Sequence, residues 1–309
     1  MLRLILVIAF VWAGTTAIWA QQDAQYTQFM FNKLYFNPAY AGSKKGLCIA
    51  AIYRNQWIGI DGAPQTATLN IHAPVWKRRM GLGLSVSNDR IGLTDRWNFD
   101  LSYAYRIRFK DESFLSIGLR GNISYLTIRW DNAKLTQVVD QSVPAAVSSK
   151  VLPNFGAGLY YQARNWYVGF SMPRLFRNRI DFNNNANSSI EPELHQHYFL
   201  MGGASFKIAK NVRIQPNVML KYVPETPFDA DINLSFVFFE KVLVGVTYRV
   251  GDSIDGLIQW KIVPQFTVSA AYDFTLTPLQ QYNAGSIEVM LEYCFCCLKG
   301  KRLHNPRFF

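Results

Sequence analysis

Residues 97–109 read WNFDLSYAYRIRF, a stretch in which apolar and polar side chains alternate with a period of two. One face carries Trp97, Phe99, Leu101, Tyr103, Tyr105, Ile107 and Phe109, and the other carries Asn98, Asp100, Ser102, Ala104, Arg106 and Arg108. This alternation predicts a β-strand with two differently solvated faces. A half-buried soluble sheet also alternates, but an apolar face this long, aromatic at both ends, is more typical of a lipid-facing strand with interfacial girdles.

The same pattern recurs along the chain with varying strength. It predicts fourteen strands, at 47–58, 65–75, 80–88, 97–109, 114–129, 152–163, 165–173, 194–208, 211–222, 228–239, 241–250, 254–263, 265–275 and 285–295. Most are near the ~9–11 residues that a tilted membrane strand needs. The even number is the one that a single-chain bacterial barrel requires.

The connections between these strands alternate in length. Every second connection is short, as in KRR after residue 75 and KDES after residue 109, whereas the two longest, 130–151 and 174–193, fall on the other side. Outer-membrane barrels have short periplasmic turns and longer external loops. The sequence therefore predicts an all-β fold, a transmembrane antiparallel β-barrel of about 14 strands over 47–295, with both termini in the periplasm.

The two ends of the chain have their own character. Residues 1–20 have one charge, Arg3, an apolar core and a small residue before polar QQD, which predicts a secretory signal peptide. Residues 21–46 are expected to be an N-terminal periplasmic or plug segment, and residues 296–309 a basic periplasmic tail. The chain carries a net charge of +11, and a nucleic-acid role is not expected in that compartment.

Few residues are candidates for catalysis. His72 has the inward parity of its predicted strand with Thr66 and Thr68 nearby, so a triad stays open, although a polar lumen residue is favoured. His195 and His197 lie on one strand face without a third metal ligand. The sequence has no phosphate-binding glycine motif, so we expect no enzyme, no metal and no cofactor.

Charged residues divide between the lumen and one rim. Parity places eight cations and seven acids in the lumen, which favours a charge-paired interior over an anion-selective pore: Arg54, Arg106, Arg108, Arg120, Arg213, Lys221, Arg249 and Lys261 against Asp100, Asp229, Asp231, Asp255, Asp273, Glu288 and Glu292. The periplasmic rim is predicted to carry Lys44, Lys45, Lys77, Arg78, Arg79, Lys299, Lys301, Arg302 and Arg307. Such a rim suits an acidic protein partner or anionic headgroups, and ordinary solvated turns are the other interpretation.

Two features lie at the predicted junction of the barrel. Cys48 begins the first strand and Cys294 ends the last, so barrel closure brings them to one seam, as a disulfide or as buried free thiols. The segment 26–42 has an aromatic content that fits no strand or helix. It is interpreted either as a plug in the lower lumen or as a face offered to a periplasmic partner through Phe29, Phe31, Asn32, Tyr35, Phe36, Asn37, Pro38 and Tyr40.

The stretches QYTQFMFNKLYFNPAYAGS and YRNQWIGIDGAPQTATLNIHAPV resemble the opening of the PorP/SprF family of type IX secretion outer-membrane proteins. The second half of the resemblance rests on Tyr53, Arg54, Asn55, Gln56, Trp57, Gly62, Ala63 and Pro64. One departure is Lys33, at a position where relatives often have proline. Beyond residue 90 the resemblance is mainly one of architecture and length.

The resemblance implies a non-enzymatic outer-membrane barrel of Bacteroidota that serves type IX secretion and, in some relatives, gliding motility. It further implies partners in a periplasmic ring of lipoprotein and partner subunits, and contact with secreted proteins that bear a C-terminal sorting domain. A passive or ligand-specific transport channel is the alternative function, and an outer-membrane hydrolase is a third.

Overall fold

The computed structural model describes residues 24–76, 79–110, 113–130, 147–179, 193–224 and 226–295. The expected signal peptide 1–20, the rim residues Lys77 and Arg78, and the tail 296–309 with Lys299, Lys301 and Arg302 lie outside the described residues. Within the described residues, no helix has both the length and the apolar character needed to cross a membrane.

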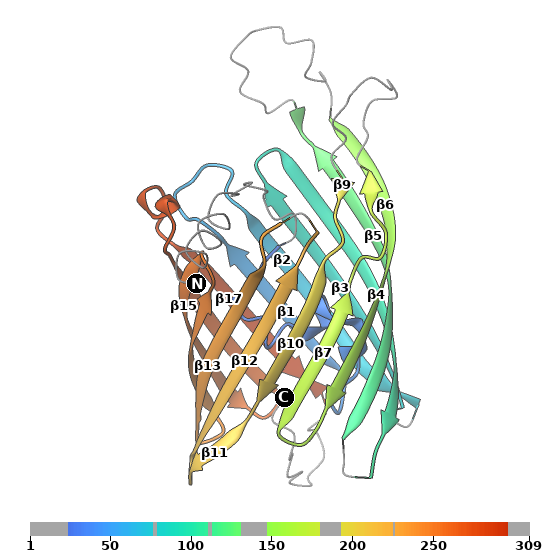
Figure 1. Cartoon of the computed structure of the whole chain (residues 1–309), viewed down its shortest axis with the longest axis vertical. Coiled ribbons are helices and arrows are strands. Elements are labelled where there is room, and N and C mark those ends of the chain that lie inside the picture. Colours follow the sequence, from blue (N-terminus) through green and yellow to red (C-terminus); the bar gives the residue numbers. More distant parts are fainter. Residues whose placement is uncertain are drawn as a thin grey trace, which may run out of the picture.

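The chain forms a closed antiparallel β-barrel (Figure 1). Its strands are β1 (Cys48–Asn55), β2 (Gln65–Val75), β3 (Met80–Ile91), β4 (Thr94–Arg108), β5 (Phe114–Ile128), β6 (Ser148–Gln162), β7 (Trp166–Met172), β10 (Tyr198–Ala204), β11 (Phe206–Ala209), β12 (Val212–Tyr222), β13 (Asp229–Phe238), β14 (Val242–Arg249), β15 (Ser253–Val263), β16 (Phe266–Thr275) and β17 (Ser286–Cys294). Neighbours in sequence pair with one another, and β1 pairs with β17 to close the ring. Because β10 and β11 are two pieces of one strand, the barrel has fourteen strands.

The predicted fold is confirmed, with local differences. The prediction of one strand over 194–208 is wrong in detail, because the strand is interrupted between β10 and β11 at the fully buried Ser205, whose backbone N–H donates to the Asn165 carbonyl. The loop expected after residue 88 is mostly strand, since β3 and β4 continue to a tight turn at Gly92. A small ribbon, β8 (Asn178–Arg179) with β9 (Glu193–Leu194), adds to the external loops.

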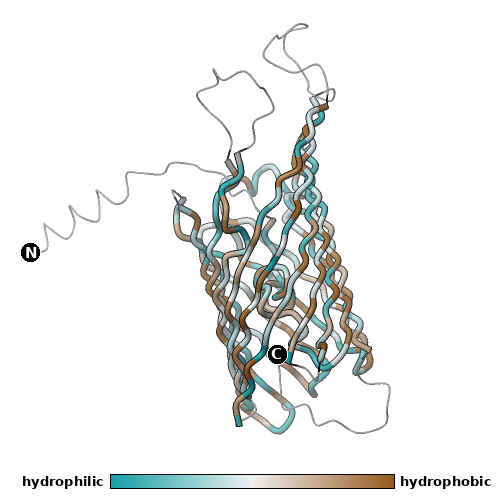
Figure 2. The backbone as a smooth tube through the Cα atoms, turned by 90° about the vertical axis from the view of Figure 1, so that its right-hand side faces the viewer, coloured by the Kyte–Doolittle hydropathy of each residue, from teal (hydrophilic) through white to brown (hydrophobic). Residues whose placement is uncertain are grey.

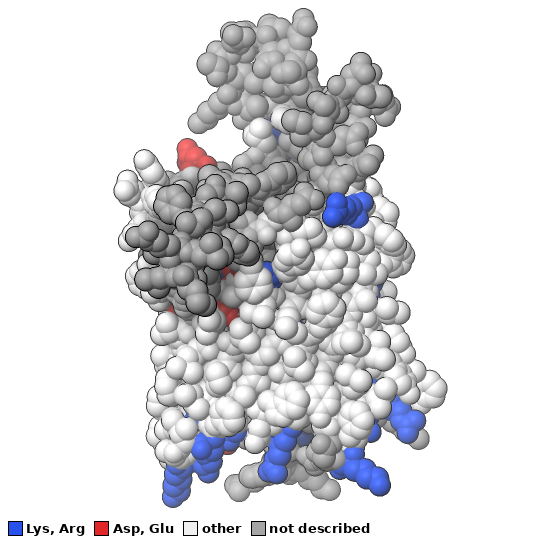
Figure 3. Space-filling model, in the orientation of Figure 1, with Lys and Arg blue, Asp and Glu red and all other residues white. Residues whose placement is uncertain are grey.

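The outer wall of the barrel is apolar and its inner wall is polar. Outward residues of β4 such as Phe99, Leu101 and Ile107 are exposed, whereas Asp100, Ser102 and Arg106 between them are buried on the lumen side. Hydrophobic and hydrophilic positions alternate along the strands (Figure 2), and a broad band without charged side chains crosses the face shown in Figure 3. This is the pattern of a wall with lipid outside and polar contacts inside.

The N-terminal segment lies inside the barrel, where the blue part of the chain crosses the lumen (Figure 1). It contains the short helix α2 (Lys33–Phe36) and the 3-10 helix η1 (Pro38–Tyr40). Tyr26, Phe29 and Phe36 are at most 2% exposed and belong to the main hydrophobic cluster of the molecule. A fourteen-strand barrel is too wide for its own wall side chains to fill, and this segment supplies the missing core.

Candidate functional site: the plugged lumen

Residues 24–46, here called the plug, run through the lumen from the long-loop half to the short-turn end. Tyr26 and Thr27 lie beside Thr68 and Asp273, whereas Gly42 lies beside Ala73 and Gly81 near the short β2–β3 turn. Between these points the aromatic residues pack edge to face, for example Tyr35 on Phe36 with ring centroids 5.2 Å apart. The aromatic side chains of this segment therefore fill the lumen, which is the first of the two interpretations of the sequence.

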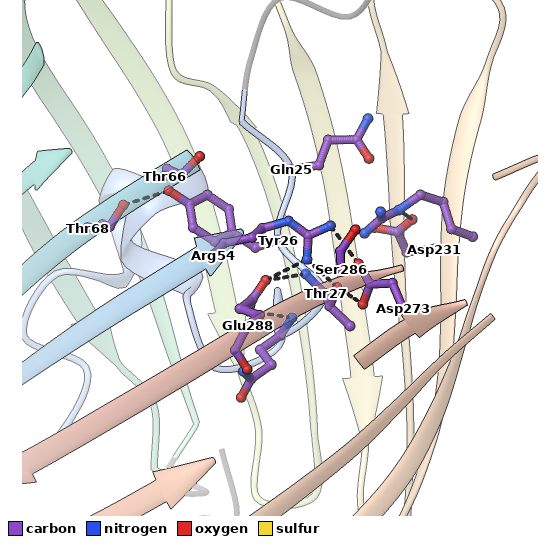
Figure 4. A network of polar contacts seen from close by, with 12 residues as sticks. Gln25, Tyr26, Thr27, Arg54, Thr66, Thr68, Asp231, Asp273, Ser286 and Glu288 are labelled. Carbon is purple, nitrogen blue, oxygen red and sulfur yellow. Dashed lines mark hydrogen bonds and ion pairs between the residues drawn. The ribbon is translucent and has the colours of Figure 1, made fainter. Parts of the chain in front are cut away.

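The first part of the plug is held by a polar network that we call the latch (Figure 4). Both carboxylate oxygens of Glu288 accept backbone N–H groups of the plug, from Thr27 at 2.8 Å and from Gln28 at 3.1 Å. The Thr27 hydroxyl donates to Asp273 at 2.7 Å. Hydrogen bonds to ionised acceptors are about twice as strong as neutral ones, so the latch fixes the plug's backbone and not only its side chains.

Arg54 joins the latch to the barrel wall. Its guanidinium donates to Glu288 at 3.0 Å, to Asp273 at 2.6 Å and to the Thr27 hydroxyl at 2.7 Å. Arg54, Asp273 and Glu288 are all at most 2% exposed. Each charge is therefore paired where water cannot screen it, which is the condition under which a buried ion network is tolerated.

Further along the plug, wall side chains bind plug carbonyls. Arg120 of β5 donates to the carbonyls of Leu34 and Tyr35, and Arg106 of β4 donates to that of Ala41 at 2.7 Å. In the opposite direction, the Asn37 side chain of the plug donates to the carbonyls of Leu159 and Phe170 at 2.9 and 3.3 Å. These bonds satisfy the irregular backbone of the plug, which has no sheet or long helix of its own.

Glycines of the wall let the plug backbone come close. A methyl group added at Gly118 would lie 2.2 Å from the Ala39 backbone nitrogen, and one added at Gly81 would lie 2.0 Å from the Ala41 carbonyl oxygen. At Gly158 the added carbon would meet the Asn37 side-chain oxygen at 2.2 Å. The wall is thus shaped for this segment, because any larger residue at these positions would push the segment away.

Lys33 is buried in the middle of the lumen. Its Nζ atom lies 3.7 Å from the centroid of the Tyr167 ring and 5.5 Å from that of Tyr40. Burial lowers the pKa of the Lys33 amine well below its ordinary value, and the charge of Lys44 lowers it further. Lys33 is also the first residue of α2, a position at which helices accept proline.

A comparison with known protein families shows which family the chain matches. A family model described as "Type IX secretion system membrane protein PorP/SprF" matches residues 18–293. The chain belongs to this family. It is a component of the type IX secretion system, and the closed barrel with its apolar outer belt places it in the outer membrane. By the connection rule for such barrels, the short-turn end is the periplasmic end.

Other comparisons add similarity of fold alone. No curated protein matches the chain in sequence. Among solved structures, the outer-membrane protein Omp33 of Acinetobacter baumannii is 10% identical with a TM-score of 0.47, covering 82% of this chain and 100% of its own. The CymD monoaromatic hydrocarbon channel is 12% identical with a TM-score of 0.49, covering 87% and 92%. A FadL homologue of Pseudomonas aeruginosa is 9% identical with a TM-score of 0.44, covering 81% and 89%.

The structure joins the two halves of the sequence block that resembles the PorP/SprF family. Arg54 from the second half binds Thr27 in the first half, and Asn37 of the first half caps η1 by accepting from the Ala39 backbone N–H. The residues after Arg54 form the external β1–β2 loop. There the Gln56 backbone donates to the Pro64 carbonyl, and Trp57 and Gly62 adopt positive φ angles of 47° and 75°.

The predicted partner-binding residues of the plug are for the most part inaccessible. Phe29, Asn32, Phe36, Asn37, Pro38 and Tyr40 are buried, and Phe31 and Tyr35 are half-buried against the same cluster. A partner therefore reaches these side chains only if the plug leaves the lumen, and a direct partner role stays a prediction.

The candidate catalytic residues have structural partners. The Nδ1 atom of His72 accepts the Gly42 backbone N–H at 3.1 Å, and the His72 ring packs against Tyr40. The His197 Nδ1 atom lies 3.1 Å from the His195 carbonyl oxygen. Across the described residues, no three His, Cys, Asp or Glu side chains are grouped so as to hold a metal ion.

Cys48 and Cys294 are directly opposite each other on β1 and β17 and form a disulfide. The bond lies at the periplasmic end of the seam that closes the barrel. The same two strands carry Arg54 and Glu288 as opposite residues in the long-loop half. The seam is therefore joined by a covalent bond near one end and by the latch near the other.

The lumen assignment made from parity needs one correction. Arg54, Arg106, Arg120, Lys221 and Arg249 are buried as expected, but Arg108 and Lys261 are exposed and Arg213 is half-buried. These three residues lie where β4, β12 and β15 reach the periplasmic rim. Parity correctly describes their face, but it carries no information on their height along the barrel.

The basic rim is broader than the sequence indicated. Of its predicted members, Lys44 forms an ion pair with Glu292, and Lys45 and Arg79 belong to the described residues. Lysines and arginines gather at the lower, periplasmic end of the molecule (Figure 3). Residues that the rim prediction missed are exposed in the short turns and strand ends at this end: Arg108, Lys110, Arg164, Lys207, Lys210, Lys241 and Lys261.

Proposed function

We propose that this PorP/SprF protein is a non-enzymatic component that anchors or couples the periplasmic secretion ring at the outer membrane and assists export of proteins with C-terminal sorting domains. The observation that carries this proposal is the filled lumen. A barrel whose interior is occupied by its own covalently attached segment is suited to holding partners in place. The resemblance to the family implies that, in some relatives, this role extends to gliding motility.

The alternative, a passive or ligand-specific transport channel, needs a continuous path through the lumen. Here the latch, the Arg120 and Arg106 bonds and the glycine contacts hold the plug at successive heights. The polar wall would become a channel only after the plug had moved. A wild-type barrel of this kind is expected to be closed to ions.

The proposed docking face is the periplasmic end, with ring subunits, a lipoprotein and its partner protein, as the proposed partners. The basic rim there supports the proposal because charge complementarity speeds encounter and orients partners. Affinity purification of the full chain from solubilised outer membrane should recover type IX secretion subunits. Recovery of none of them would count against the anchoring role.

Deletion of residues 24–36 distinguishes the proposed anchoring function from the alternative transport function. This variant loses the latch contacts and half the plug, but the fourteen strands keep their pairing, so assembly should proceed and secretion should fail. Planar-bilayer recordings should show a closed wild type and an open deletion variant. Normal secretion by the assembled deletion variant would refute a functional role for the plug, and a large stable conductance of the wild type would favour the transport function.

A further inference from the structure

Four cationic residues at the periplasmic end share the inward face of the barrel, and we call them the periplasmic mouth: Arg108, Lys207, Arg213 and Lys261. Cross-strand partners lie on the same face of a sheet. Arg108 is opposite Phe114, which is 1% exposed inside the barrel, and Lys261 is opposite Thr267, which is 9% exposed. Lys207 is opposite Arg213. The Arg213 guanidinium in turn donates to the hydroxyl of the fully buried Ser205 at 3.0 Å.

The mouth cations lie below the plug and remain in contact with water. Arg108, Lys207 and Lys261 are exposed and Arg213 is half-buried, whereas the next inward residues above them, such as Arg106, are buried against the plug. Lys45, where the plug leaves the lumen, adds to the positive charge. Among the described residues at this end, the acids are Glu240 in a turn and Glu292, which is paired with Lys44.

Because the mouth side chains point into the barrel opening, they can bind anions that enter the opening but not the headgroups of lipids outside the wall. The outward neighbours of the mouth residues are apolar and exposed, namely Phe109, Phe206 and Ile262. Lipid therefore meets an aromatic and aliphatic border, while the cations face the opening of the barrel. Headgroups of the surrounding leaflet lie outside the wall and are separated from the mouth by the strands themselves.

The spacing of the cations decides the size of the ligand. In the ring of strands, β4 is separated from β12 by β5, β6, β7 and β10, and from β15 by β3, β2, β1, β17 and β16. The cations therefore stand on opposing parts of the rim. A single small anion cannot reach them together, but an extended chain with several carboxylates can, and clustered positive charges attract such a ligand.

We propose that the periplasmic mouth receives an acidic polypeptide segment of a periplasmic partner, which enters the barrel opening and rests against the lower end of the plug. The proposal rests on the proposed docking at the periplasmic end and names the chemistry of the partner there. It concerns residues inside the opening, distinct from the predicted rim residues Lys77, Arg78 and Arg79 and from the C-terminal tail.

The test uses the full chain, purified and inserted into nanodiscs of zwitterionic lipid, and a fluorescent peptide of alternating Glu and Ser. The wild type should bind this peptide and not a Lys and Ser peptide of the same length. The double variant Lys207→Glu, Lys261→Glu should weaken binding by at least about tenfold. Raising the salt from about 0.05 to 0.5 M should also weaken it, because the exposed charges are then screened within a few ångströms.

A matched control carries the same change of net charge at the other end of the barrel. Arg90→Glu with Arg177→Glu, both exposed in the external half, should leave peptide binding within about twofold of the wild type. Equal loss in both double variants, or no loss in the mouth variant, would overturn the proposal. Where the double variant fails to assemble, the single variants Lys261→Glu and Arg90→Glu, both at exposed side chains, give a matched comparison.

Vesicles of phosphatidylglycerol distinguish protein from lipid recognition. Added in excess, they should not displace the acidic peptide, and displacement would show that the mouth reads anionic headgroups and would overturn the proposal. The proposed function can fail separately. Recovery of no secretion subunits by the wild type would reject anchoring, whereas recovery unchanged in the mouth variant would reject this site while leaving anchoring intact.

Discussion

Arg54 and Glu288 face each other across β1 and β17, the two strands that close the barrel, and both bind Thr27 of the plug. One ion pair therefore belongs to the closing seam and to the latch at once. Closure of the barrel and seating of the plug are physically coupled, because each completes the hydrogen-bonding of the same buried charges. Four predictions test this arrangement and its surroundings.

Replacement of Arg54 by Met should destabilise the barrel strongly. It leaves Asp273 and Glu288 buried without their cation, and breaking a buried pair in this way costs ~3–5 kcal/mol. The free energy of unfolding, measured by urea titration in lipid or detergent, should fall by about that amount. Arg90→Met is the control, since the Arg90 side chain is 59% exposed beside Asp95 and its pair is worth about 0–1 kcal/mol. Equal effects of the two substitutions would contradict the buried latch.

Gly118→Ala should displace the plug, because the new methyl group would lie 2.2 Å from the Ala39 backbone. The wall itself tolerates alanine, so the barrel should assemble while its lumen leaks. Gly121→Ala is a matched control on the same strand, where an added carbon meets nothing within 4 Å. Single-channel recordings should show ion conductance for Gly118→Ala only. A tight Gly118→Ala barrel would mean that the plug backbone adjusts without losing its seal.

Cys48→Ser should remove the covalent link at the seam. The bond joins residues 246 apart in sequence, and in the chain-entropy model a link of this span stabilises by several kcal/mol, roughly 5. Denatured wild-type protein should migrate faster on non-reducing than on reducing gels, and Cys48→Ser and Cys294→Ser should each abolish the difference. A wild type in which Cys48 and Cys294 both react with a thiol reagent after denaturation without reductant would instead support free thiols.

Lys33→Met should stabilise the barrel and remove one source of pH dependence. Because burial lowers the pKa of the Lys33 amine, the unfolded chain binds a proton there that the folded chain has lost, across the interval between the lowered pKa and the ordinary value. Stability should therefore rise with pH through that interval in the wild type.

Unfolding titrations at several pH values check the Lys33 prediction. The Lys33→Met variant should have a flatter profile and the larger gain at low pH, where the wild type keeps a charged amine buried over the Tyr167 and Tyr40 rings. A wild-type profile that falls with rising pH over the same range would contradict the assignment of a neutral Lys33.

Much of the wall could be predicted from local patterns. Alternation places Phe99 outside and Asp100 inside, and the short turns locate the periplasmic end. Both depend on neighbouring residues, because side chains of a strand change face at every step. The start of the first strand and the end of the last predicted that Cys48 and Cys294 could approach each other once closure of the ring was assumed. The alternation did not predict how close Arg108 and Lys261 lie to the end of the barrel, because it distinguishes only inward from outward residues.

The sequence by itself determined the alternating wall, its strand order and the two ends of the barrel, since these follow from the periodicity of nearby residues and from the lengths of connections. Only the tertiary structure decided the place of the plug. Thr27 meets Asp273 and Glu288, more than two hundred residues away in the chain, and Ala39 meets Gly118 through a close backbone approach that leaves no periodic trace. Such contacts form because the lumen of a wide barrel is larger than its own wall side chains can fill. The buried charges and the glycines of the wall fit the one segment that occupies this space.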